Sequence, residues 1–367
     1  MSGWPMVALS EVCYPKQWPT ISHSEFTEHG FPVYGANGQI GFYSKYNHEE
    51  STVLITCRGA TCGAINVCPP RSYVTGNAMA LDRLDRERVD LRYLVYALTP
   101  DRLRRSITGS AQPQITRASL QGVEIPLPPT VEQRRIAAIL DHAGALRAKR
   151  REALARLDEL TQSIFIDMFG QNDRDVGDEP PLGDKLTFLT SGSRGWAKYY
   201  TDAGDLFIRI QNVGSDELRL NDVAYVQPPV TAEAQRTRVQ VGDVLLSITA
   251  DLGRTAVVDE TAVGGYVNQH LAILRSNEYE PAYLSRYLSS PAGQHQISSK
   301  SRGGTKAGLN FDDVRSLRVP CPPLEDQRIF ARRAQAVDTL RRTHRTAIVE
   351  LDALFASLQS RAFRGEL

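Results

Sequence analysis

The chain of 367 residues contains an internal repeat, which limits the architectures that it can adopt. Residues 125–169 recur as residues 319–363, about 194 positions further along the chain and without a gap. Pro-Leu-Pro-Pro-Thr-Val-Glu-Gln-Arg in the first copy corresponds to Pro-Cys-Pro-Pro-Leu-Glu-Asp-Gln-Arg in the second. Likewise, Leu157-Asp-Glu-Leu corresponds to Leu351-Asp-Ala-Leu. Roughly a third of the aligned positions are identical, which is too many for chance.

A weaker repeat precedes each copy. Residues 52–67 resemble residues 243–258, and residues 73–81 resemble residues 266–274. The chain therefore consists of two diverged globular domains, each followed by a similar segment. The predicted boundaries are a first domain, a first helix, a linker, a second domain and a second helix, over residues 1–124, 125–170, 171–181, 182–318 and 319–367.

The repeated segments are predicted to be long helices. Each begins with Pro-Pro, then an acidic residue and Gln-Arg, a pattern typical of a helix start. Apolar residues then recur in steps of three and four over roughly four heptads, as in a coiled coil. A helix of about 36 residues is about 54 Å long, so we predict that the two helices pack on each other. The alternative is that each covers its own domain. The predicted seam, with Arg150 and His344 as a polar break, contains Ile139, Leu146, Arg150, Leu157, Leu160, Ile164, Leu340, His344, Leu351, Leu354 and Leu358.

The two globular domains are predicted to be mixed α/β. Runs rich in β-branched residues at 52–56, 244–249 and 255–258 indicate strands that end at glycine turns. Residues 91–98 and 281–288 indicate short helices. The fold class is therefore mixed α/β, with a pseudo-two-fold repeat and two long helices.

Composition excludes some functions. Lys+Arg 43 against Asp+Glu 42 gives a net charge of +1, so any nucleic-acid surface must be local. No apolar run is long enough for a membrane span, and no secretory signal is expected. Cys57, Cys62 and Cys68 lack the paired spacing of a zinc site, so small buried residues are the preferred interpretation.

No catalytic motif is recognisable. The glycine-rich segment at 303–308 lacks the Gly-Lys-Ser/Thr end of a phosphate-binding loop. Asn66 is not followed directly by Pro-Pro, as an amino-methyltransferase motif would require. The sequence therefore favours a binding protein with no catalytic residue and no metal ligand.

The chain resembles the specificity (S) subunits of type I restriction-modification systems over essentially its whole length. The resemblance lies in the two-domain, two-helix layout, in Pro-Leu-Pro-Pro-x-x-Glu-Gln-Arg-x-Ile, and in the helix end Leu-Asp-Glu-Leu…Ser-Ile-Phe. Tyr34-Gly-Ala-Asn-Gly-Gln-Ile-Gly-Phe adds to it. The two helix starts are its specific part.

The resemblance implies a non-catalytic subunit whose globular domains are target recognition domains, each reading one half of a bipartite, asymmetric site in double-stranded DNA. The helices would form an antiparallel coiled coil that spaces the domains and binds two methyltransferase subunits, with restriction-translocase subunits as further partners. S-adenosylmethionine, ATP and Mg²⁺ are expected on those partners, and no cofactor on this chain. A cytoplasmic location at the nucleoid of a bacterium or archaeon is implied.

Candidate DNA-binding residues are polar side chains in the predicted loops and hairpins. Arginine can pair with guanine, and asparagine or glutamine with adenine. The alternative for any one of them is a solvated loop side chain. The first domain contributes Arg58, Thr61, Asn77, Arg105, Gln112 and Gln114. The second contributes Arg194, Asn212, Arg254, Asn268, Gln269, Lys300, Arg302 and Lys306.

Two other functions stay open from the residues alone. One is a two-headed protein-interaction scaffold that uses the same helices without DNA. The other is a stand-alone DNA-modifying enzyme that has diverged too far to show its motif. Binding of S-adenosylmethionine by the isolated chain would indicate an enzyme, and salt-dependent DNA binding with a methyltransferase partner would exclude the scaffold.

Overall fold

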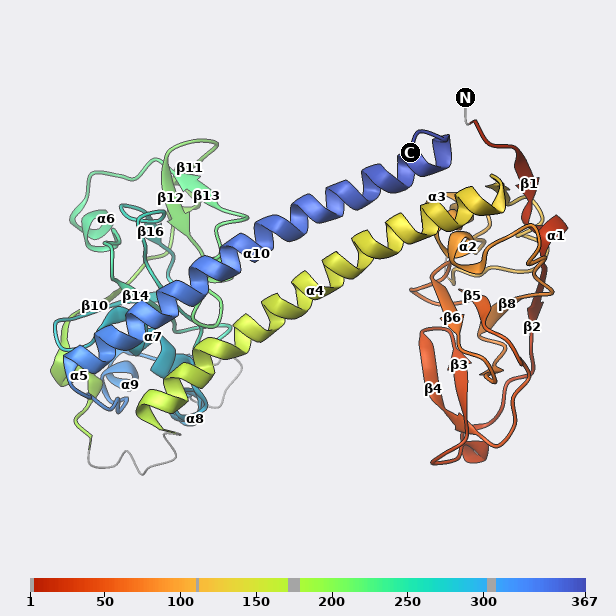
Figure 1. The fold of residues 1–367 in the computed structure, drawn as a ribbon. Coiled ribbons are helices and arrows are strands. Elements are labelled where there is room, and N and C mark those ends of the chain that lie inside the picture. The colour runs from red at the N-terminus through yellow and green to blue at the C-terminus, as the bar shows by residue number, and fades with distance from the viewer. Residues whose placement is uncertain (1–2, 110–111, 171–178, 302–307) are drawn as a thin grey trace. The chain divides into compact units, whose positions relative to one another are not determined.

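The computed structural model describes residues 3–109, 112–170, 179–301 and 308–367. The chain forms two compact units: unit 1 comprises residues 1–151 and 346–367, and unit 2 comprises residues 152–345. The long helices α4 (Thr130–Phe169) and α10 (Leu324–Arg364) each contribute residues to both units (Figure 1). Most of the predicted linker lies outside the described residues.

Unit 1 is built on a four-stranded antiparallel sheet in the order β2-β8-β5-β6. A three-stranded sheet, β4-β3-β7, and the pair β1-β9 complete its strands. Short helices cover the larger sheet, and Tyr93 and Leu94 of α2 are fully buried in its core. The strands are β1 (Met6–Ala8), β2 (Tyr14–Gln17), β3 (Phe31–Gly35), β4 (Gly38–Tyr43), β5 (Thr52–Thr56), β6 (Ile65–Cys68), β7 (Tyr73–Val74), β8 (Ala78–Asp82) and β9 (Glu124–Pro126), and the helices are α1 (Leu9–Val12), α2 (Leu91–Ala97) and α3 (Pro100–Arg104).

Unit 2 repeats this plan. Its central sheet has the order β10-β17-β14-β15, so each strand has a counterpart in β2-β8-β5-β6. A second sheet, β11-β13-β12-β16, contains a parallel pair, β12 with β16, which matches β3 with β7 in unit 1. The strands are β10 (Leu186–Ser191), β11 (Tyr200–Thr201), β12 (Asp205–Ile208), β13 (Ala224–Val226), β14 (Val244–Ser247), β15 (Thr255–Val257), β16 (Tyr266–Val267) and β17 (Leu271–Ser276), and the helices are α5 (Leu182–Lys185), α6 (Ala232–Arg236), α7 (Pro281–Ser289), α8 (Pro291–Lys300) and α9 (Phe311–Arg315).

The predicted class and repeat are confirmed. Both units are mixed α/β, the predicted strands are β5, β14 and β15, and the predicted short helices are α2 and α7. The equal strand orders show that the weak repeat of the globular domains reflects a common fold.

A buried glutamine joins the start of α4 to unit 1. The side-chain amide of Gln133 donates to the carbonyl oxygens of Arg88 and Pro128, each at 2.8 Å. Its oxygen accepts the backbone N–H of Asp90 at 2.8 Å. Gln133 is 0% exposed, so all three hydrogen bonds are shielded from water.

Gln327 makes the same joint at the start of α10. It donates to the carbonyl oxygens of Glu278 at 3.3 Å and Pro322 at 2.8 Å, and accepts the N–H of Glu280 at 2.8 Å. It is also 0% exposed. The glutamine of the repeated Gln-Arg pair, interpreted from sequence only as part of a helix start, therefore fastens each helix to its globular domain.

Within unit 1, the start of α4 packs antiparallel to the end of α10. The Arg135 guanidinium donates to the backbone oxygen of Leu367 at 3.3 Å. Further along α4, Arg147 donates to Asp352 at 2.5 Å, and its guanidinium lies 4.4 Å from the ring centre of Phe355. Increasing residue numbers in one helix thus match decreasing numbers in the other.

Within unit 2, the end of α4 packs antiparallel to the start of α10. Arg341 and Asp158 form an ion pair at 3.1 Å. About two turns further along α4 and about three turns earlier in α10, the rings of Phe165 and Phe330 pack edge to face with centres 5.3 Å apart. Thus the helices pack on each other as predicted, in both units.

The ion pairs of the two units are related by the repeat. Arg147 corresponds to Arg341, and Asp352 corresponds to Asp158. The hydrogen bond from Arg147 lowers the pKa of Asp352, which keeps that carboxylate charged. Arg151 also pairs with Asp352, at 2.9 Å, so two basic residues of α4 bind the same carboxylate of α10.

The predicted seam is wrong by about one residue at several positions. Leu146, Leu160, Leu340 and Leu354 are 43%, 40%, 50% and 50% exposed, and Arg150 is exposed as well. The positions after the four leucines face the other helix instead, and three of these residues are polar. Arginine stems and ion pairs fill the interface, so the leucines lie at its edge. The other predicted seam residues are half-buried, namely Ile139, Leu157, Ile164, His344, Leu351 and Leu358.

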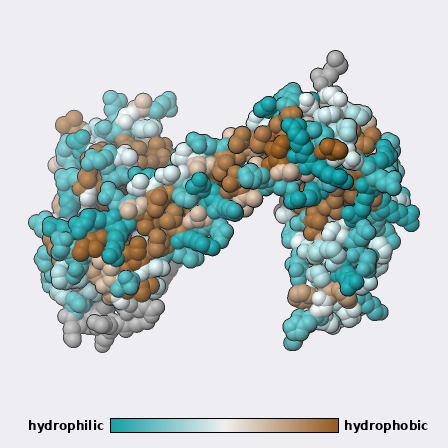
Figure 2. All heavy atoms as spheres, in the orientation of Figure 1, coloured by the Kyte–Doolittle hydropathy of each residue, from teal (hydrophilic) through white to brown (hydrophobic). Residues whose placement is uncertain are grey.

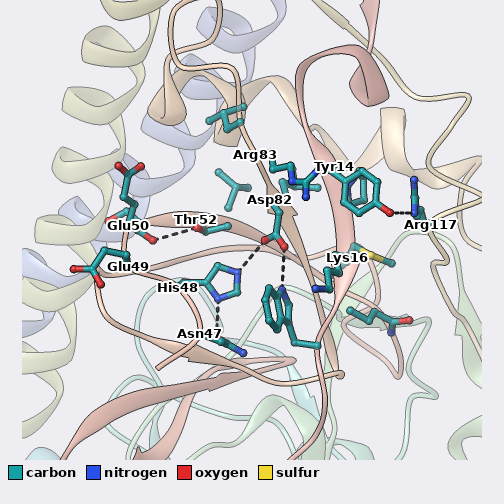
Figure 3. A pocket seen from close by; sticks show the side chains of 18 of the residues that line it. Tyr14, Lys16, Asn47, His48, Glu49, Glu50, Thr52, Asp82, Arg83 and Arg117 are labelled. Atoms are coloured by element: carbon teal, nitrogen blue, oxygen red, sulfur yellow. Dashed lines mark hydrogen bonds and ion pairs between the residues drawn. The ribbon is translucent and has the colours of Figure 1, made fainter. Parts of the chain in front are cut away.

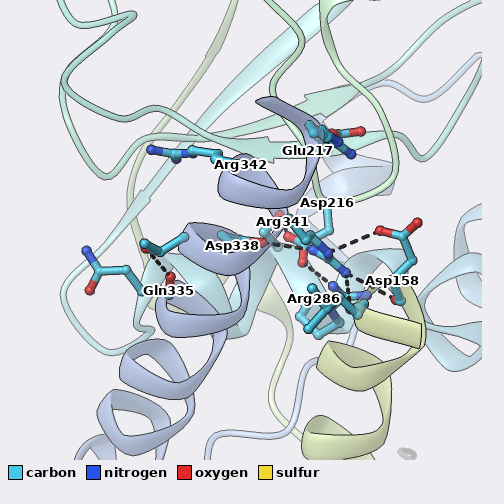
Figure 4. Close-up of polar contacts among 12 residues, drawn as sticks. Asp158, Asp216, Glu217, Arg286, Gln335, Asp338, Arg341 and Arg342 are labelled. Atoms are coloured by element: carbon cyan, nitrogen blue, oxygen red, sulfur yellow. Dashed lines mark hydrogen bonds and ion pairs between the residues drawn. The ribbon is translucent and has the colours of Figure 1, made fainter. Parts of the chain in front are cut away.

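A polar cluster fixes residues 213–219 of unit 2 to helices α7 and α10 (Figure 4). Asp216, with a left-handed φ of +58°, pairs with Arg286 at 2.9 Å. Burial raises the pKa of Asp216, and the Arg286 charge opposes that shift. Glu217 pairs with Arg345 at 2.7 Å and donates its backbone N–H to Thr255 of β15 at 3.1 Å. The cluster therefore connects the β14–β15 hairpin to the helices.

Candidate nucleic-acid interface

Three loops of unit 1 meet at one end of the central sheet. The backbone N–H of Cys57, after β5, donates to the carbonyl of Asn77 at 3.2 Å. The Cys57 carbonyl accepts from Ile115 at 2.9 Å. Thr108 and Gln114 exchange two backbone hydrogen bonds of 2.8 Å, and Gln114 also bridges to Arg58. The β5–β6 turn, the β7–β8 connection and the described residues 107–109 and 112–115 thus form one loop surface.

This surface gathers the predicted residues of the first domain. Five are exposed on the three loops, namely Arg58, Thr61, Asn77, Gln112 and Gln114. The sixth, Arg105, is exposed at the C-terminal end of α3, directly before the third loop. Asn37 was missed: its side chain accepts the Thr61 hydroxyl at 2.5 Å, from the β3–β4 turn. The Gly-Ala-Asn-Gly sequence around Asn37 is a turn signal that could have found it.

The same arrangement of backbone hydrogen bonds between loops, called here the loop frame, recurs in unit 2. The N–H of Ile248, after β14, donates to the carbonyl of His270 at 2.9 Å. The Ile248 carbonyl accepts from Leu309 at 2.8 Å, and Thr249 bridges to Gly308. His270 occupies the position of Asn77 in the repeat and was missed from the sequence. Its ring contacts Thr249 and Gln269.

The predicted residues of the second domain are only partly on this surface. Asn268 and Gln269 lie in the β16–β17 connection, with Asn268 9% exposed. Gly192 packs against the backbone of that connection, which places the loop containing the exposed Arg194 beside it. Lys300 is the last residue of α8 and half-buried. Arg302 and Lys306 lie outside the described residues.

Two predictions for the second domain need correction. Asn212 is 1% exposed, and its amide donates to the carbonyls of Arg219 and Asp222 at 2.9 and 2.7 Å. Its oxygen accepts the N–H of Arg209 at 2.9 Å, so the side chain caps a turn and is not presented to DNA. Arg254 forms an ion pair with Asp251 and donates to a backbone carbonyl inside the unit. The residue type alone does not show that either side chain makes its contacts inside the protein.

The surface of unit 1 is locally basic despite the near-neutral chain. Arg58, Arg104 and Arg105 are exposed, and in the described part of the chain none has a carboxylate within 4.0 Å. Arg102, by contrast, is half-buried and donates to the carbonyl of Glu124 at 3.1 Å. The available charge is therefore concentrated beside the loop surface.

Two of the three clustered cysteines are buried small residues of unit 1. Cys57 and Cys68 are 0% exposed, and burial raises the pKa of Cys57 to about 11, which keeps its thiol protonated. Across residues 3–109, 112–170, 179–301 and 308–367, no group of three or more His, Cys, Asp or Glu is placed to hold a metal ion. In the same ranges no helix combines the length and apolarity that crossing a membrane requires.

Two related α/β units, each with a polar loop surface and a share of two long helices, define a tandem recognition protein. Comparisons with known proteins agree. A crystal structure of the type I restriction-modification S subunit from M. genitalium matches 99% of this chain and 96% of its own, with a TM-score of 0.65 and 16% identity. A structure from work on assembly and conformational transition of the type I R-M system matches with a TM-score of 0.57 and 22% identity, covering 100% of this chain and 98% of its own. These similarities establish the fold.

Sequence relatives point to the same class. A specificity subunit of Haemophilus influenzae, S.HindORF215P, is 24% identical over 81% of this chain and 77% of its own length. The EcoKI specificity subunit of Escherichia coli is 25% identical over 69% of this chain and 60% of its own. The EcoBI specificity subunit is 29% identical over 44% of this chain, an alignment that spans about a third of the relative (35%).

The chain belongs to the family of type I restriction modification DNA specificity domains, whose profile matches residues 1–156 and 213–353. The predicted resemblance is therefore confirmed. Its named relatives are specificity subunits, and none of the comparisons favours a stand-alone enzyme or a scaffold without DNA.

Proposed function

We propose that each unit of this specificity subunit reads one half of a bipartite sequence in double-stranded DNA through its loop surface. The observation that carries the proposal is that the two units share the loop frame but have different side chains at equivalent positions of it. Asn77 and Gln114 in unit 1 correspond to His270 and Gly308 in unit 2. A common frame would present both surfaces to DNA in a similar way, while different polar groups would select different bases. The half-sites should therefore differ in sequence.

We further propose that two methyltransferase subunits bind the helices, one in each unit. Leu146 and Leu354 in unit 1 each precede a residue that faces the other helix, and Leu160 and Leu340 do the same in unit 2. Equivalent flanking positions of an antiparallel pair lie along the same edge, so each unit exposes a leucine pair. The repeat relates Leu146 to Leu340 and Leu160 to Leu354.

These pairs are matched, exposed apolar patches on the helix surface. Figure 2 shows hydrophobic side chains over the helices α4 and α10. Two equivalent patches suit two copies of one partner, which argues for a symmetric stoichiometry. The methyltransferases would supply S-adenosylmethionine and the methyl transfer, and restriction subunits the ATP- and Mg²⁺-dependent steps. The complex would act on chromosomal DNA in the cytoplasm.

Sequencing of methylated DNA tests the reading role. A host with this subunit and its methyltransferase should methylate one bipartite sequence that is absent without this gene. Gln114→Ala should relax one half of that sequence and His270→Ala the other, whereas Gln121→Ala, an exposed control, should change neither. Relaxation of both halves by one variant would contradict separate reading by each unit.

Native mass spectrometry tests the docking role. Leu146→Glu with Leu354→Glu should remove one methyltransferase copy, and Leu160→Glu with Leu340→Glu should remove the other. Val349→Glu, at a position 69% exposed on α10, is the matched control and should leave both copies bound. Two bound copies in every variant would refute the assignment of the leucine pairs.

A further inference from the structure

Unit 1 contains a pocket of about 830 Å³ that the loop surface does not use. It lies between the outer strand β2, the end of β8 and residues 47–52 (Figure 3). Its lining is mostly polar and charged. Pockets of this size can take a nucleotide-sized group.

One carboxylate of the pocket, Asp82, is fully engaged within the protein. It accepts the indole N–H of Trp18 at 3.0 Å and pairs with His48 at 2.9 Å. The other ring nitrogen of His48 lies 2.7 Å from the side-chain oxygen of Asn47. This hydrogen-bonded chain forms a rigid wall of the pocket.

The other two carboxylates are paired as well. Glu49 pairs with Arg71 at 3.3 Å, and Glu50 pairs with Arg86 at 2.9 Å. Figure 3 shows Glu49 and Glu50 on the side of the pocket away from Tyr14 and Arg117. No carboxylate of the pocket is therefore directed at its remaining cations.

Those cations are Lys16, Arg83 and Arg117, and aromatic rings hold them. The Lys16 amine lies 3.6 Å from the ring centre of Trp18. The guanidinium groups of Arg117 and Arg83 lie 3.8 and 5.4 Å from the ring centre of Tyr14, whose hydroxyl accepts from Arg117. In the described ranges none of the three has a carboxylate within 4.0 Å. Three like charges around one space repel each other unless an anion enters it.

The backbone adds a second sign of a ligand. Arg83 has a left-handed φ of +52°, which a residue with a Cβ rarely adopts. In unit 2 the position that corresponds to Asp82 is Arg275, which pairs with the buried Asp243 at 2.9 Å and covers Phe188. Arg275 thus takes the place of Asp82 and is neutralised within unit 2, whereas Lys16, Arg83 and Arg117 of unit 1 have no such partner in the described ranges.

We propose that Lys16, Arg83 and Arg117 bind a backbone phosphate of the DNA that unit 1 reads, next to its half-site. This inference rests on the proposed function. Gln17, beside Lys16 on β2, donates to the carbonyl of Gly76 at 2.9 Å, directly before Asn77. The Gln17 edge of the pocket therefore reaches the backbone beside Asn77 of the loop surface. Phosphate oxygens accept from both arginines and from lysine, and aromatic packing fixes these groups in advance.

The salt dependence of DNA binding tests this assignment in the complex with the methyltransferase. Each phosphate contact to duplex DNA contributes about 0.9 to the slope of log K against log salt. Lys16→Ala with Arg117→Ala should therefore reduce the slope by about 0.9, and should weaken binding about fivefold at 0.15 M salt. The methylated sequence should stay the same, because phosphates carry no base information. Lys45→Ala removes an exposed charge of unit 1 outside the pocket and should leave the slope unchanged.

The outcomes separate this inference from the proposed function. An unchanged slope in the double variant, or a changed methylated sequence, would overturn the phosphate assignment while leaving DNA reading intact. Saturable binding of AMP that the double variant abolishes, with an unchanged slope, would assign the pocket to a free nucleotide and also overturn it. Absence of sequence-specific binding by the unmodified complex would instead refute the proposed function.

Discussion

Replacing Gln133 with alanine should destabilise unit 1 strongly, although the side chain is small and polar. The substitution removes three hydrogen bonds of 2.8 Å at a site 0% exposed, two of them between α4 and the globular domain and one to Pro128 just before the helix. A buried hydrogen bond contributes about 1 kcal/mol net, so the direct loss is about 3 kcal/mol. The backbone groups of Arg88, Asp90 and Pro128 lose their partner, which opposes any recovery by local repacking.

Urea unfolding of the full chain measures this loss. The transition that reports on unit 1 should shift to lower urea by the equivalent of about 3 kcal/mol, with an unchanged m-value. Gln327→Ala should produce the same loss in the transition of unit 2, because its three bonds are equivalent. Gln133→Glu should lose most of the stability too, since a carboxylate accepts from Asp90 but cannot donate to two carbonyls.

The control and the refuting result are simple. Gln121→Ala changes an exposed glutamine of the same unit and should shift the transition by less than about 0.5 kcal/mol. A Gln133→Ala variant that behaves like this control would show that the joint does not depend on the buried hydrogen bonds, and that other contacts hold α4 on unit 1.

Three more predictions concern other parts of the chain. Gly192→Ala should impair reading by unit 2, because the added methyl group would overlap the carbonyl of Val267, whereas Gly122→Ala has open space and should be neutral in the methylation assay. Phe165→Ala should cost about 3–5 kcal/mol in urea unfolding, since the ring is 2% exposed. Asp352→Asn should lower the melting temperature at pH 7. Because the folded pKa of Asp352 is lowered, its contribution is present above the ordinary value of 3.8 and disappears as the pH falls through the folded pKa, so the two melting curves should converge below about pH 4. A difference independent of pH would contradict that ion pair.

Much of the fold was predictable because a repeat is a long-range signal. The 194-residue offset aligns both helix starts, and the strands β5 and β14 are short apolar runs whose type follows from β-branched residues. The role of Gln133 was not predictable in the same way. Two of its three partners are backbone groups 43 and 45 positions away, and backbone groups leave no mark on the sequence.

The helix interface shows a different limit. The periodicity of apolar residues placed leucines in the seam between α4 and α10. In the structure Arg147 and Arg341 face the partner helix instead, and Leu146 and Leu340 lie beside them. Hydrophobic periodicity assumes that burial follows residue type, whereas a long arginine can bury its stem and pair its head with an aspartate. The one-residue error is itself informative, because it leaves the four leucines exposed, as the proposed docking role requires.

Whether a predicted loop residue is exposed or used inside the protein could be anticipated only in part, for a related reason. Arg58, Thr61 and Gln114 flank strands whose pairing brings the loops together, so their exposure followed from the topology. Asn212 has the same residue type and the same kind of loop position, but its amide completes the hydrogen bonds of a turn. Whether an asparagine serves its own backbone or a ligand depends on which carbonyls lie within about 3 Å, and that is decided by tertiary structure. Sequence chemistry therefore identifies which groups can read a base, and the fold decides which of them are available to do so.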